Sequence, residues 1–229
     1  SDLGRRISLK QRSTMQEATA APQMGGIVRL TGFILRITAV FELAGAVLLL
    51  PVFCTDYGLR GIWYALFHSI SAFCNAGFDL LGTEKAKFVS LTRYAGNPFL
   101  TTVIAVLIIF GGLGFLTWED ICVHRFDFHR YRMQSKVILV TTAILLVLPA
   151  LYFYFYEFTS GSVEQRILLS MFQSVTPRTA GFNTADLSAM SSTSQALMVI
   201  LMLLGGSPGS TAGGMKTTTL AVLLANMWA

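Results

Sequence analysis

The chain has 229 residues, of which 53% are hydrophobic and 13% are charged, and its mean hydropathy is +0.60. A soluble domain carries about a quarter charged residues, so this composition argues against a soluble globular protein. The net charge of +5 does not indicate nucleic-acid binding, because the basic residues gather in short clusters beside apolar stretches, as in the cytoplasmic loops of membrane proteins. We therefore predict an all-α integral membrane protein that crosses the plasma membrane several times.

The first half of the chain predicts a long helix, a short helix, a glycine-containing loop and a second long helix. Residues 1–26 are polar and basic and are expected to form a cytoplasmic connection. Residues 27–53 predict a spanning helix, whereas Arg60–Cys74, at about 1.5 Å per residue, is too short to cross a bilayer. The loop that follows consists of Asn75, Ala76, Gly77 and Phe78. After a polar stretch, Pro98 opens a charge-free helix that is expected to end at Trp118.

The same order recurs in the second half. Residues 119–135 are basic and predict a second cytoplasmic loop. Residues 136–157 predict a long helix, and Gln165–Val175 predicts a short one. The loop after it consists of Thr179, Ala180, Gly181 and Phe182. We therefore divide the chain into two helix–pore-loop–helix repeats, residues 27–118 and 136–229, with the intervening loop cytoplasmic and residues 54–60 and 79–97 external.

Matching words support this internal repeat. Gly77 and Gly181 are 104 residues apart, within Asn-Ala-Gly-Phe-Asp and Thr-Ala-Gly-Phe-Asn. The short helices before them carry the matching words Phe-His-Ser-Ile and Phe-Gln-Ser-Val. Two copies of the pattern favour a shared function over a chance tight turn.

The last segment predicts one helix broken by a glycine-rich loop. Ala196–Leu204 is a short apolar run, and the chain continues as GGSPGSTAGGMKTTT over Gly205–Thr219 before a second short run from Leu220. Irregular backbone survives at membrane depth only where protein buries it or where it lines a water-filled cavity. Because glycine and serine offer little area to bury, we expect a weakly packed loop with several conformations, which suits a gate. The candidate gate residues are Gly205, Gly206, Ser207, Pro208, Gly209, Ser210, Thr211, Ala212, Gly213, Gly214 and Lys216.

Two other interpretations of this loop remain open. It approaches the phosphate-binding pattern G-x-x-x-x-G-K-[ST], but Met215 separates Gly214 from Lys216, and no strand precedes it. Its small residues could instead serve close helix packing. Lys216 would either repel a cation or pair with a carboxylate or with backbone carbonyls.

The paired glycine loops have the chemistry of a potassium filter. A dehydrated potassium ion needs several oxygen ligands, which rings of backbone carbonyls supply. Glycine permits the backbone conformations that aim successive carbonyls at one axis. The short helices would point their partially negative C-terminal ends at the ion, and the two phenylalanines could anchor the loops. The predicted ligands are the carbonyls of Asn75, Ala76, Gly77, Phe78, Thr179, Ala180, Gly181 and Phe182.

Competing functions are a secondary transporter with a midplane substrate site at the broken helix, and a membrane scaffold. No arrangement typical of an enzyme is visible, and no cofactor is expected. Glu42 lies deep in the first helix, where it either has a functional role or pairs with Arg36 or a neighbouring helix. Cys54, Cys74 and Cys122 are expected to be free thiols.

Three motifs together resemble a known family. They are His-Ser-Ile-Ser-Ala-Phe leading into Asn75–Phe78, the word Thr-Pro-Arg-Thr-Ala-Gly-Phe-Asn-Thr over Thr176–Thr184, and the glycine-rich loop. The chain resembles the membrane subunit of the bacterial Ktr potassium uptake system, in the Trk/Ktr/HKT superfamily. The resemblance implies four covalently linked repeats around one pore, of which this sequence holds roughly the second and third. We therefore expect it to be part of a longer chain.

The resemblance also implies partners. It implies a homodimer in which each subunit has its own pore, a KtrA-like cytoplasmic ring of nucleotide-binding regulatory subunits, and potassium transport that often depends on Na⁺. Asp127, Arg130 and Arg132 on the cytoplasmic loop are candidates for docking that ring, although a solvated charged loop is an equally simple interpretation. The glycine-rich loop would be the intramembrane gate beneath the filter.

Overall fold

The computed structural model of the protein describes residues 27–84, 89–125 and 127–228. Within these ranges the regular structure is helical, apart from isolated bridge residues such as Leu204 and Met215. The predicted all-α fold is therefore confirmed. The predicted cytoplasmic connection, residues 1–26, lies outside the described residues.

The first repeat begins with α2 (Ile27–Tyr57), which packs along α3 (Arg60–Phe73) and α4 (Pro98–Gly112). Helix α4 starts where the sequence predicts, because the Asn97 side chain accepts a hydrogen bond from the Leu100 amide at 3.1 Å and proline takes the first helical position. Helix α2 extends four residues beyond the predicted end at residue 53.

The expected continuous helix from Pro98 to Trp118 is wrong. Helix α4 ends at Gly112, and α5 (Phe115–His124) leaves it at an angle of 98°. The turn occurs at Gly114, whose φ of +85° is a conformation that side-chain-bearing residues avoid. The predicted cytoplasmic loop, residues 119–135, accordingly starts later than expected, because residues 119–124 are helical.

The second repeat contains α6 (Met133–Tyr152), a π-helical turn (Phe153–Glu157), α7 (Val163–Val175), α8 (Ser192–Leu203) and α9 (Thr217–Trp228). Helix α7 starts two residues before the predicted Gln165, because Ser162 and Gln165 form a reciprocal capping box. The short 3₁₀ helices of the described chain are Thr92–Tyr94, Phe128–Arg130 and Leu187–Ala189.

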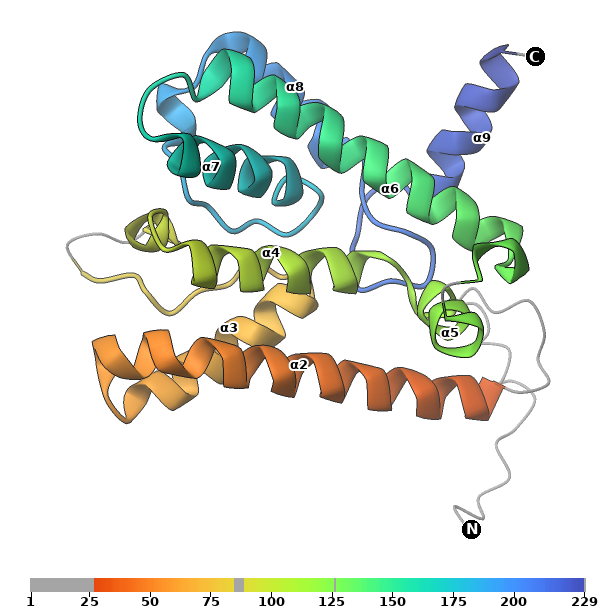
Figure 1. The fold of residues 1–229 in the computed structure, drawn as a ribbon, viewed down its shortest axis with the longest axis horizontal. Coiled ribbons are helices and arrows are strands. Elements are labelled where there is room, and N and C mark those ends of the chain that lie inside the picture. The colour runs from red at the N-terminus through yellow and green to blue at the C-terminus, as the bar shows by residue number, and fades with distance from the viewer. Residues whose placement is uncertain (1–26, 85–88, 126, 229) are drawn as a thin grey trace.

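Two helical segments are long and apolar enough to span a bilayer, Val28–Tyr57 and Met133–Glu157, and the bent pair α4–α5 could supply a third span. Helices α8 and α9 are each too short to cross, as the broken-helix prediction requires. Figure 1 shows α8 and α9 joined by a long loop that descends to the junction of α4 and α5.

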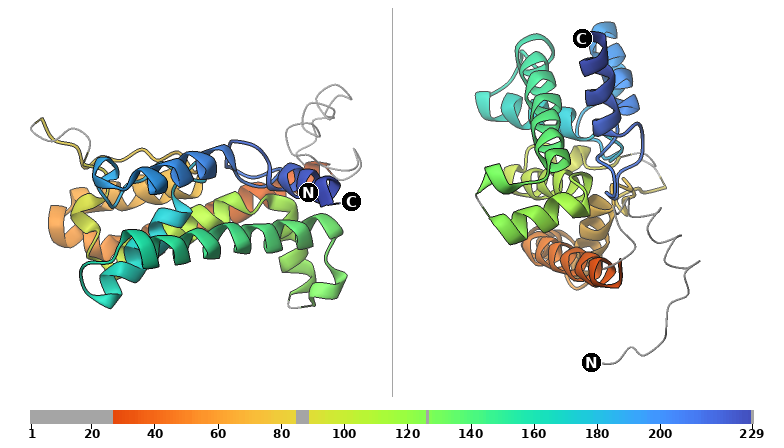
Figure 2. Two further views of the ribbon diagram at one scale, coloured as in Figure 1. Left: turned by 90° about the horizontal axis from the view of Figure 1, so that it is seen from above. Right: turned by 90° about the vertical axis from the view of Figure 1, so that its right-hand side faces the viewer.

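The two repeats share one core. In both Figure 1 and the right-hand view of Figure 2, α2, α4 and α6 follow one another in that order across the molecule. The main cluster of buried residues joins α2 and α4 to the second short helix and the loop after it. Its members include Leu49, Phe53, Leu100, Ile104, Phe172, Val175 and Phe182. This shared core positions α3 and α7 so that their C-terminal loops can meet.

Candidate functional site

The two predicted pore loops lie against each other. A Cβ atom built on Gly77 would stand 2.2 Å from the Ala180 carbonyl oxygen. A Cβ on Gly181 would lie 3.6 Å from the Gly77 Cα. Loops that are 104 residues apart in sequence thus touch through their glycines.

Both loops have the same unusual backbone pattern. The φ angles are +50° at Asn75 and +70° at Gly77 in the first loop, and +68° at Thr179 and +83° at Gly181 in the second. The alanine between each pair has negative φ, so the sign of φ alternates along both loops. This alternation turns successive peptide planes so that their carbonyls can face one side. Left-handed φ in a β-branched residue is rare and marks Thr179 as a strained position of the kind found at functional sites.

A hydroxyl group holds the end of each loop, which the sequence did not lead us to single out. Ser71 Oγ donates to the Phe78 carbonyl at 2.7 Å, and Thr176 Oγ1 donates to the Phe182 carbonyl. The two hydroxyls make the same kind of bond but stand seven and six residues before their phenylalanines, so aligning the two loop words would not have paired them. Because both phenylalanine carbonyls already accept a hydrogen bond from a pore helix, the carbonyls of the three preceding residues are the freer ligands in each loop.

The two phenylalanines differ. The Phe182 side chain is buried and its ring centre lies 6.4 Å from that of His68 on α3. The Phe78 side chain is 69% exposed. Phe182 is therefore anchored within this chain, whereas the described residues leave Phe78 largely uncovered. His68 itself is packed, stacking on Phe53 and bonding the Tyr64 carbonyl at 2.7 Å.

Ser90 and Leu91, which precede α4, hold the residue that follows the second loop. The Leu91 amide donates to the Asn183 carbonyl at 2.9 Å, and the Asn183 amide donates to Ser90 Oγ at 2.9 Å. Nearby, the Tyr94 hydroxyl donates to Asp56 at 2.6 Å. Burial and this bond raise the pKa of Tyr94, so its hydroxyl remains protonated and available as a donor.

The glycine-rich loop forms a closed neck. The Gly205 amide donates to the Met215 carbonyl at 3.0 Å, and the Gly206 amide donates to the Gly213 carbonyl at 3.1 Å. A Cβ on Gly205 would stand 1.9 Å from the Gly213 carbonyl oxygen, so only glycine fits there. We use the word neck for these two paired strands of the loop, residues 204–206 and 213–215.

The rest of the loop rests on the corner between α4 and α5. The Ser207 amide donates to the Gly112 carbonyl at 3.0 Å, and the Phe115 amide donates to the Gly209 carbonyl at 2.8 Å. The Thr211 amide donates to the Gly111 carbonyl at 3.2 Å. The glycines at the bend of α4 thus expose backbone groups that bind the loop. The break in the helix therefore supplies hydrogen-bonding groups to the loop.

Side chains also tie the loop to both pore loops. Thr211 Oγ1 donates to the Phe73 carbonyl at 2.7 Å and accepts from Asn75 Nδ2 at 3.2 Å. The Gly213 amide donates to Thr179 Oγ1 at 3.2 Å. The expectation that this loop lacks stabilising contacts is wrong. Without side chains its backbone comes close enough to hydrogen-bond, which offsets the small area it buries.

Two cations bind carbonyls of the loop. Lys216 Nζ donates to the Ala212 carbonyl at 2.9 Å, which is the carbonyl-paired alternative left open by the sequence. Arg178 Nη2 donates to the Gly205 carbonyl at 3.4 Å, and the Arg178 side chain is buried. Several loop amides that a bound phosphate would need already donate to carbonyls, which weakens the nucleotide-binding interpretation.

Glu42 is adjacent to the first pore helix rather than paired with Arg36. Cys74 Sγ donates to Glu42 Oε1 at 3.7 Å, and Ser69 Oγ donates to the Glu42 carbonyl at 2.7 Å. The pairing with a neighbouring helix is therefore the alternative that the structure supports. The three cysteines are free, and no cluster of three or more metal-binding side chains occurs in the described ranges.

At the corner between α5 and α6, a buried carboxylate holds the two helices together. Asp120 accepts hydrogen bonds from Ser135 Oγ at 2.6 Å and from the Arg132 amide at 3.0 Å. Arg132 also pairs with Glu119 at 2.7 Å. Arg130 is instead 72% exposed and pairs with Asp127 at 2.9 Å.

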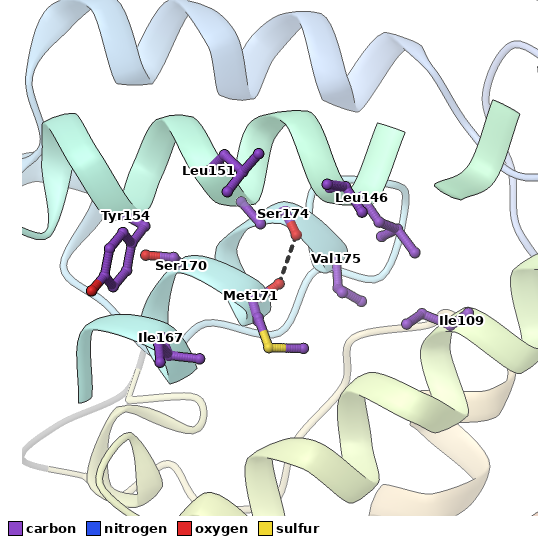
Figure 3. A pocket seen from close by; sticks show the side chains of 11 residues that line it. Ile109, Leu146, Leu151, Tyr154, Ile167, Ser170, Met171, Ser174 and Val175 are labelled. Carbon is purple, nitrogen blue, oxygen red and sulfur yellow. Dashed lines mark hydrogen bonds between the residues drawn. The ribbon is translucent and has the colours of Figure 1, made fainter. Parts of the chain in front are cut away.

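A separate pocket of about 330 Å³ lies between α4, α6 and α7 (Figure 3). Its walls are mainly aliphatic, with Ile109 at one end and Tyr154 at the other. The two serine hydroxyls in it bond their own helix, Ser170 to the Arg166 carbonyl and Ser174 to the Met171 carbonyl. The described lining of this pocket is thus mainly apolar.

Comparison with known proteins shows the family to which the chain belongs. The family model described as "TrkH: Cation transport protein" matches residues 4–228. The chain belongs to the TrkH family. Members of the TrkH family are membrane-embedded ion transporters and not enzymes, in agreement with the predicted class.

Individual relatives are similar over almost the whole chain. The potassium/sodium uptake protein NtpJ of Enterococcus hirae is 41% identical over 98% of this chain and 50% of its own length. The Ktr system potassium uptake protein B is 36% identical in Vibrio alginolyticus, over 98% of this chain and 50% of its own, and 34% in Bacillus subtilis, over 98% and 51%. The chain thus spans about half the length of these relatives.

A solved structure has the same fold. The potassium transporter TrkH from Vibrio parahaemolyticus matches with a TM-score of 0.70 and 18% sequence identity, over 93% of this chain and 45% of that one. At this identity the likeness concerns the arrangement of helices, and it supports the helix–pore-loop–helix architecture of the TrkH family for this chain.

Proposed function

We propose that the protein to which this chain belongs conducts potassium ions across the plasma membrane, through a filter to which this chain contributes two of the carbonyl-bearing segments. The observation that carries the proposal is the contact between the two loops, which share alternating left-handed residues. The potassium and sodium transport stated in the names of the relatives agrees with it.

The filter ligands in this proposal are the carbonyls of Asn75–Gly77 and Thr179–Gly181. Helices α3 and α7 both end just before these loops, so the negative ends of their dipoles favour a cation there. Ser71 and Thr176 fix the carbonyls that follow, which stiffens each loop. Oxygen ligands held in this way replace the hydration shell of a potassium ion at little reorganisation cost.

The glycine-rich loop is the gate in this proposal. It hydrogen-bonds to the base of both pore loops, so it lies where ions leaving the filter would pass. Lys216 and Arg178 occupy carbonyls of the loop, so in this arrangement the loop offers positive charge rather than ion ligands. A fixed positive charge in a place with little water opposes the passage of a cation.

A secondary transporter with a midplane site at the broken helix is the alternative. The break between α8 and α9 agrees with it, but its amides and carbonyls are bonded to the corner of α4 and α5 and to the pore loops. The channel-like proposal also explains why a short helix precedes each glycine loop, which the transporter interpretation does not require.

The partners are proposed on the family relationship. We propose a homodimer and a KtrA-like cytoplasmic ring of nucleotide-binding regulatory subunits, with the corner between α5 and α6 facing that ring. Sodium is proposed as an ion on which transport depends. The name of the Enterococcus hirae relative includes both potassium and sodium.

The test is ion uptake by the complete protein in liposomes. Rubidium-86 uptake driven by a potassium gradient should be suppressed by excess external K⁺ and be insensitive to amino acids and sugars. Empty liposomes and liposomes that hold an unrelated membrane protein are the controls. Uptake that an organic solute drives or blocks would favour the transporter alternative, and the absence of ion uptake by an inserted protein would reject both.

A further inference from the structure

Arg178 lies directly before the second filter loop, in a place where a charge is hard to explain by solvation. It follows α7 by three residues, and only 7% of the residue is exposed. Its side chain makes one hydrogen bond in the described chain, from Nη2 to the Gly205 carbonyl at 3.4 Å, and its Nε has no partner there. A buried cation with so few partners costs free energy, which suggests that the position has a role beyond packing.

The contact that Arg178 makes is at the neck of the glycine-rich loop. The Gly205 carbonyl belongs to one strand of the neck, and the Gly205 amide is already bonded to Met215 across it. The next residue of the filter loop, Thr179, accepts from the Gly213 amide on the opposite strand. Consecutive residues of the second filter loop therefore hold the two strands of the neck.

The first filter loop makes a different contact. It reaches the tip of the glycine-rich loop through Thr211, whose hydroxyl bonds the Phe73 carbonyl and Asn75. These are neutral hydrogen bonds, whereas a charged donor makes a stronger one. Among the described side-chain contacts that reach the glycine-rich loop from the two filter loops and from Arg178, the one with a charged donor is thus at the neck.

We propose that Arg178 is a positioning residue that holds the closed gate at its neck, so that the second filter loop and the glycine-rich loop are mechanically joined. This inference rests on the proposed function. It adds that the second repeat stabilises the closed gate, through the charged hydrogen bond from Arg178 to the Gly205 carbonyl. Opening of the gate requires this bond to break.

The test compares two arginines in the complete protein. Arg178→Met removes the charged donor and keeps an apolar stem. Arg166→Met is the matched control, because Arg166 also donates to backbone carbonyls, those of Phe158 and Tyr154, but away from the loop. Rubidium uptake without the regulatory ring should rise on the order of tenfold in Arg178→Met, as expected for the loss of one charged hydrogen bond from the closed state. It should not rise in Arg166→Met, and Arg178→Lys should restore most of the closure.

A second readout follows the neck itself. In a protein whose Cys54, Cys74 and Cys122 are replaced by serine, Met215→Cys places a thiol on the neck. A charged thiol reagent should modify it several-fold faster when Arg178→Met is added, because less of the gate is closed. Arg178→Gln with Met215→Cys, which also removes the charge, serves the same test if the Met variant does not insert.

The outcomes separate the two proposals. If the unaltered protein shows no K⁺-suppressed rubidium uptake, the proposed function fails. If it does show such uptake but Arg178→Met and Arg166→Met behave alike, with equal thiol modification at position 215, Arg178 does not hold the gate. A loss of K⁺ preference over Na⁺ in Arg178→Met, without a rise in unregulated flux, would also overturn the inference, because Arg178 would then support the filter alone.

Discussion

Gly77 and Gly181 occupy equivalent places in the two loops, but their surroundings are not equivalent. Both have φ in the left-handed region, which costs a residue with a side chain roughly 1–2 kcal/mol. A Cβ at Gly77 would in addition meet the Ala180 carbonyl oxygen at 2.2 Å, whereas a Cβ at Gly181 has only an ordinary contact at 3.6 Å. The first glycine is thus required by both conformation and space, and the second by conformation.

This difference predicts unequal effects of the same substitution. Gly77→Ala should lower rubidium affinity and K⁺ preference over Na⁺ by more than Gly181→Ala, because it must also displace the second loop. The measurement is competition of K⁺ and Na⁺ against rubidium-86 uptake in liposomes. Gly96→Ala is the control, since a Cβ there meets nothing within 4 Å and φ is not left-handed. Unchanged selectivity in both pore-loop variants would reject the filter assignment.

Some residue roles could be predicted from the sequence and others could not. The two glycine loops and their neighbours follow from the repeated words. Ser71 and Thr176 carry no pattern by themselves, because a serine or threonine at a helix end has many uses. Their role becomes visible only when the carbonyls of Phe78 and Phe182 are placed. Arg178 is also invisible as a loop partner, because its contact with Gly205 joins distant parts of the chain.

At the scale of helices, the unexpected feature is the corner between α4 and α5. Hydropathy predicts a single helix here, since residues 99–118 contain no charged residue. The bend depends on Gly114 and on the backbone groups of Gly111 and Gly112 that bind the glycine-rich loop. Such long-range backbone contacts have no signature in local composition, so neither the bend nor the firm seat of the loop could be predicted from the sequence.

Removing the glycine-rich loop tests its role as a gate. Deletion of residues 206–213 removes the bonds that Thr211 and Gly213 make to the two pore loops, and it should raise K⁺ flux and reduce dependence on the regulatory ring. Selectivity should remain with the loops of Gly77 and Gly181. Lys216→Ala should act in the same direction more weakly, because one cation–carbonyl bond is lost. Rubidium uptake with and without the ring measures both, and unchanged flux in an inserted deletion protein would make the loop a packing feature.

The corner between α5 and α6 separates two arginines that the sequence grouped together. Among the described residues, Arg130 forms an ion pair with Asp127 at the surface. Such a pair is worth about 0–1 kcal/mol, so Arg130 can exchange it for a partner at little cost. Arg132 bonds Glu119 and, through its amide, the buried Asp120. Asp127 and Arg130 thus remain docking candidates, whereas Arg132 has a structural task.

Charge reversal at the two positions should therefore differ. Arg130→Glu should weaken co-purification of the regulatory ring and leave thermal stability unchanged. Arg132→Glu should lower the melting temperature, because it places a third carboxylate beside Glu119 and Asp120. Co-purification at low and raised salt, together with a melting curve of the isolated membrane protein, distinguishes the two. A ring that stays bound to Arg130→Glu would place the docking site elsewhere.

For the whole molecule, the contrast between Phe182 and Phe78 indicates how repeats join. Phe182 of the second repeat packs near His68 on the pore helix of the first. Phe78 is the equivalent residue of the first repeat and is 69% exposed. By the same rule, Phe78 should pack against the pore helix of a further repeat, in agreement with relatives about twice as long as this chain.

Labelling of the complete protein tests this arrangement. In a background without native cysteines, Phe78→Cys should react slowly with a thiol reagent. Leu59→Cys should react quickly, because Leu59 is 88% exposed at the turn between α2 and α3. The ratio of the two rates is the measurement. Equal rates at both positions would contradict a covering repeat at Phe78.

The packing of Phe182 near His68 has a consequence for how the protein is made. The second filter loop packs near the short helix α3, which the ribosome synthesises before it, so this supporting surface is already made when the loop emerges. A defect in α3 should therefore impair maturation of the second filter segment, whereas a defect in α7 should leave the first segment able to form during synthesis. The filter segments would then assemble in the order in which they are translated, starting from the N-terminal side.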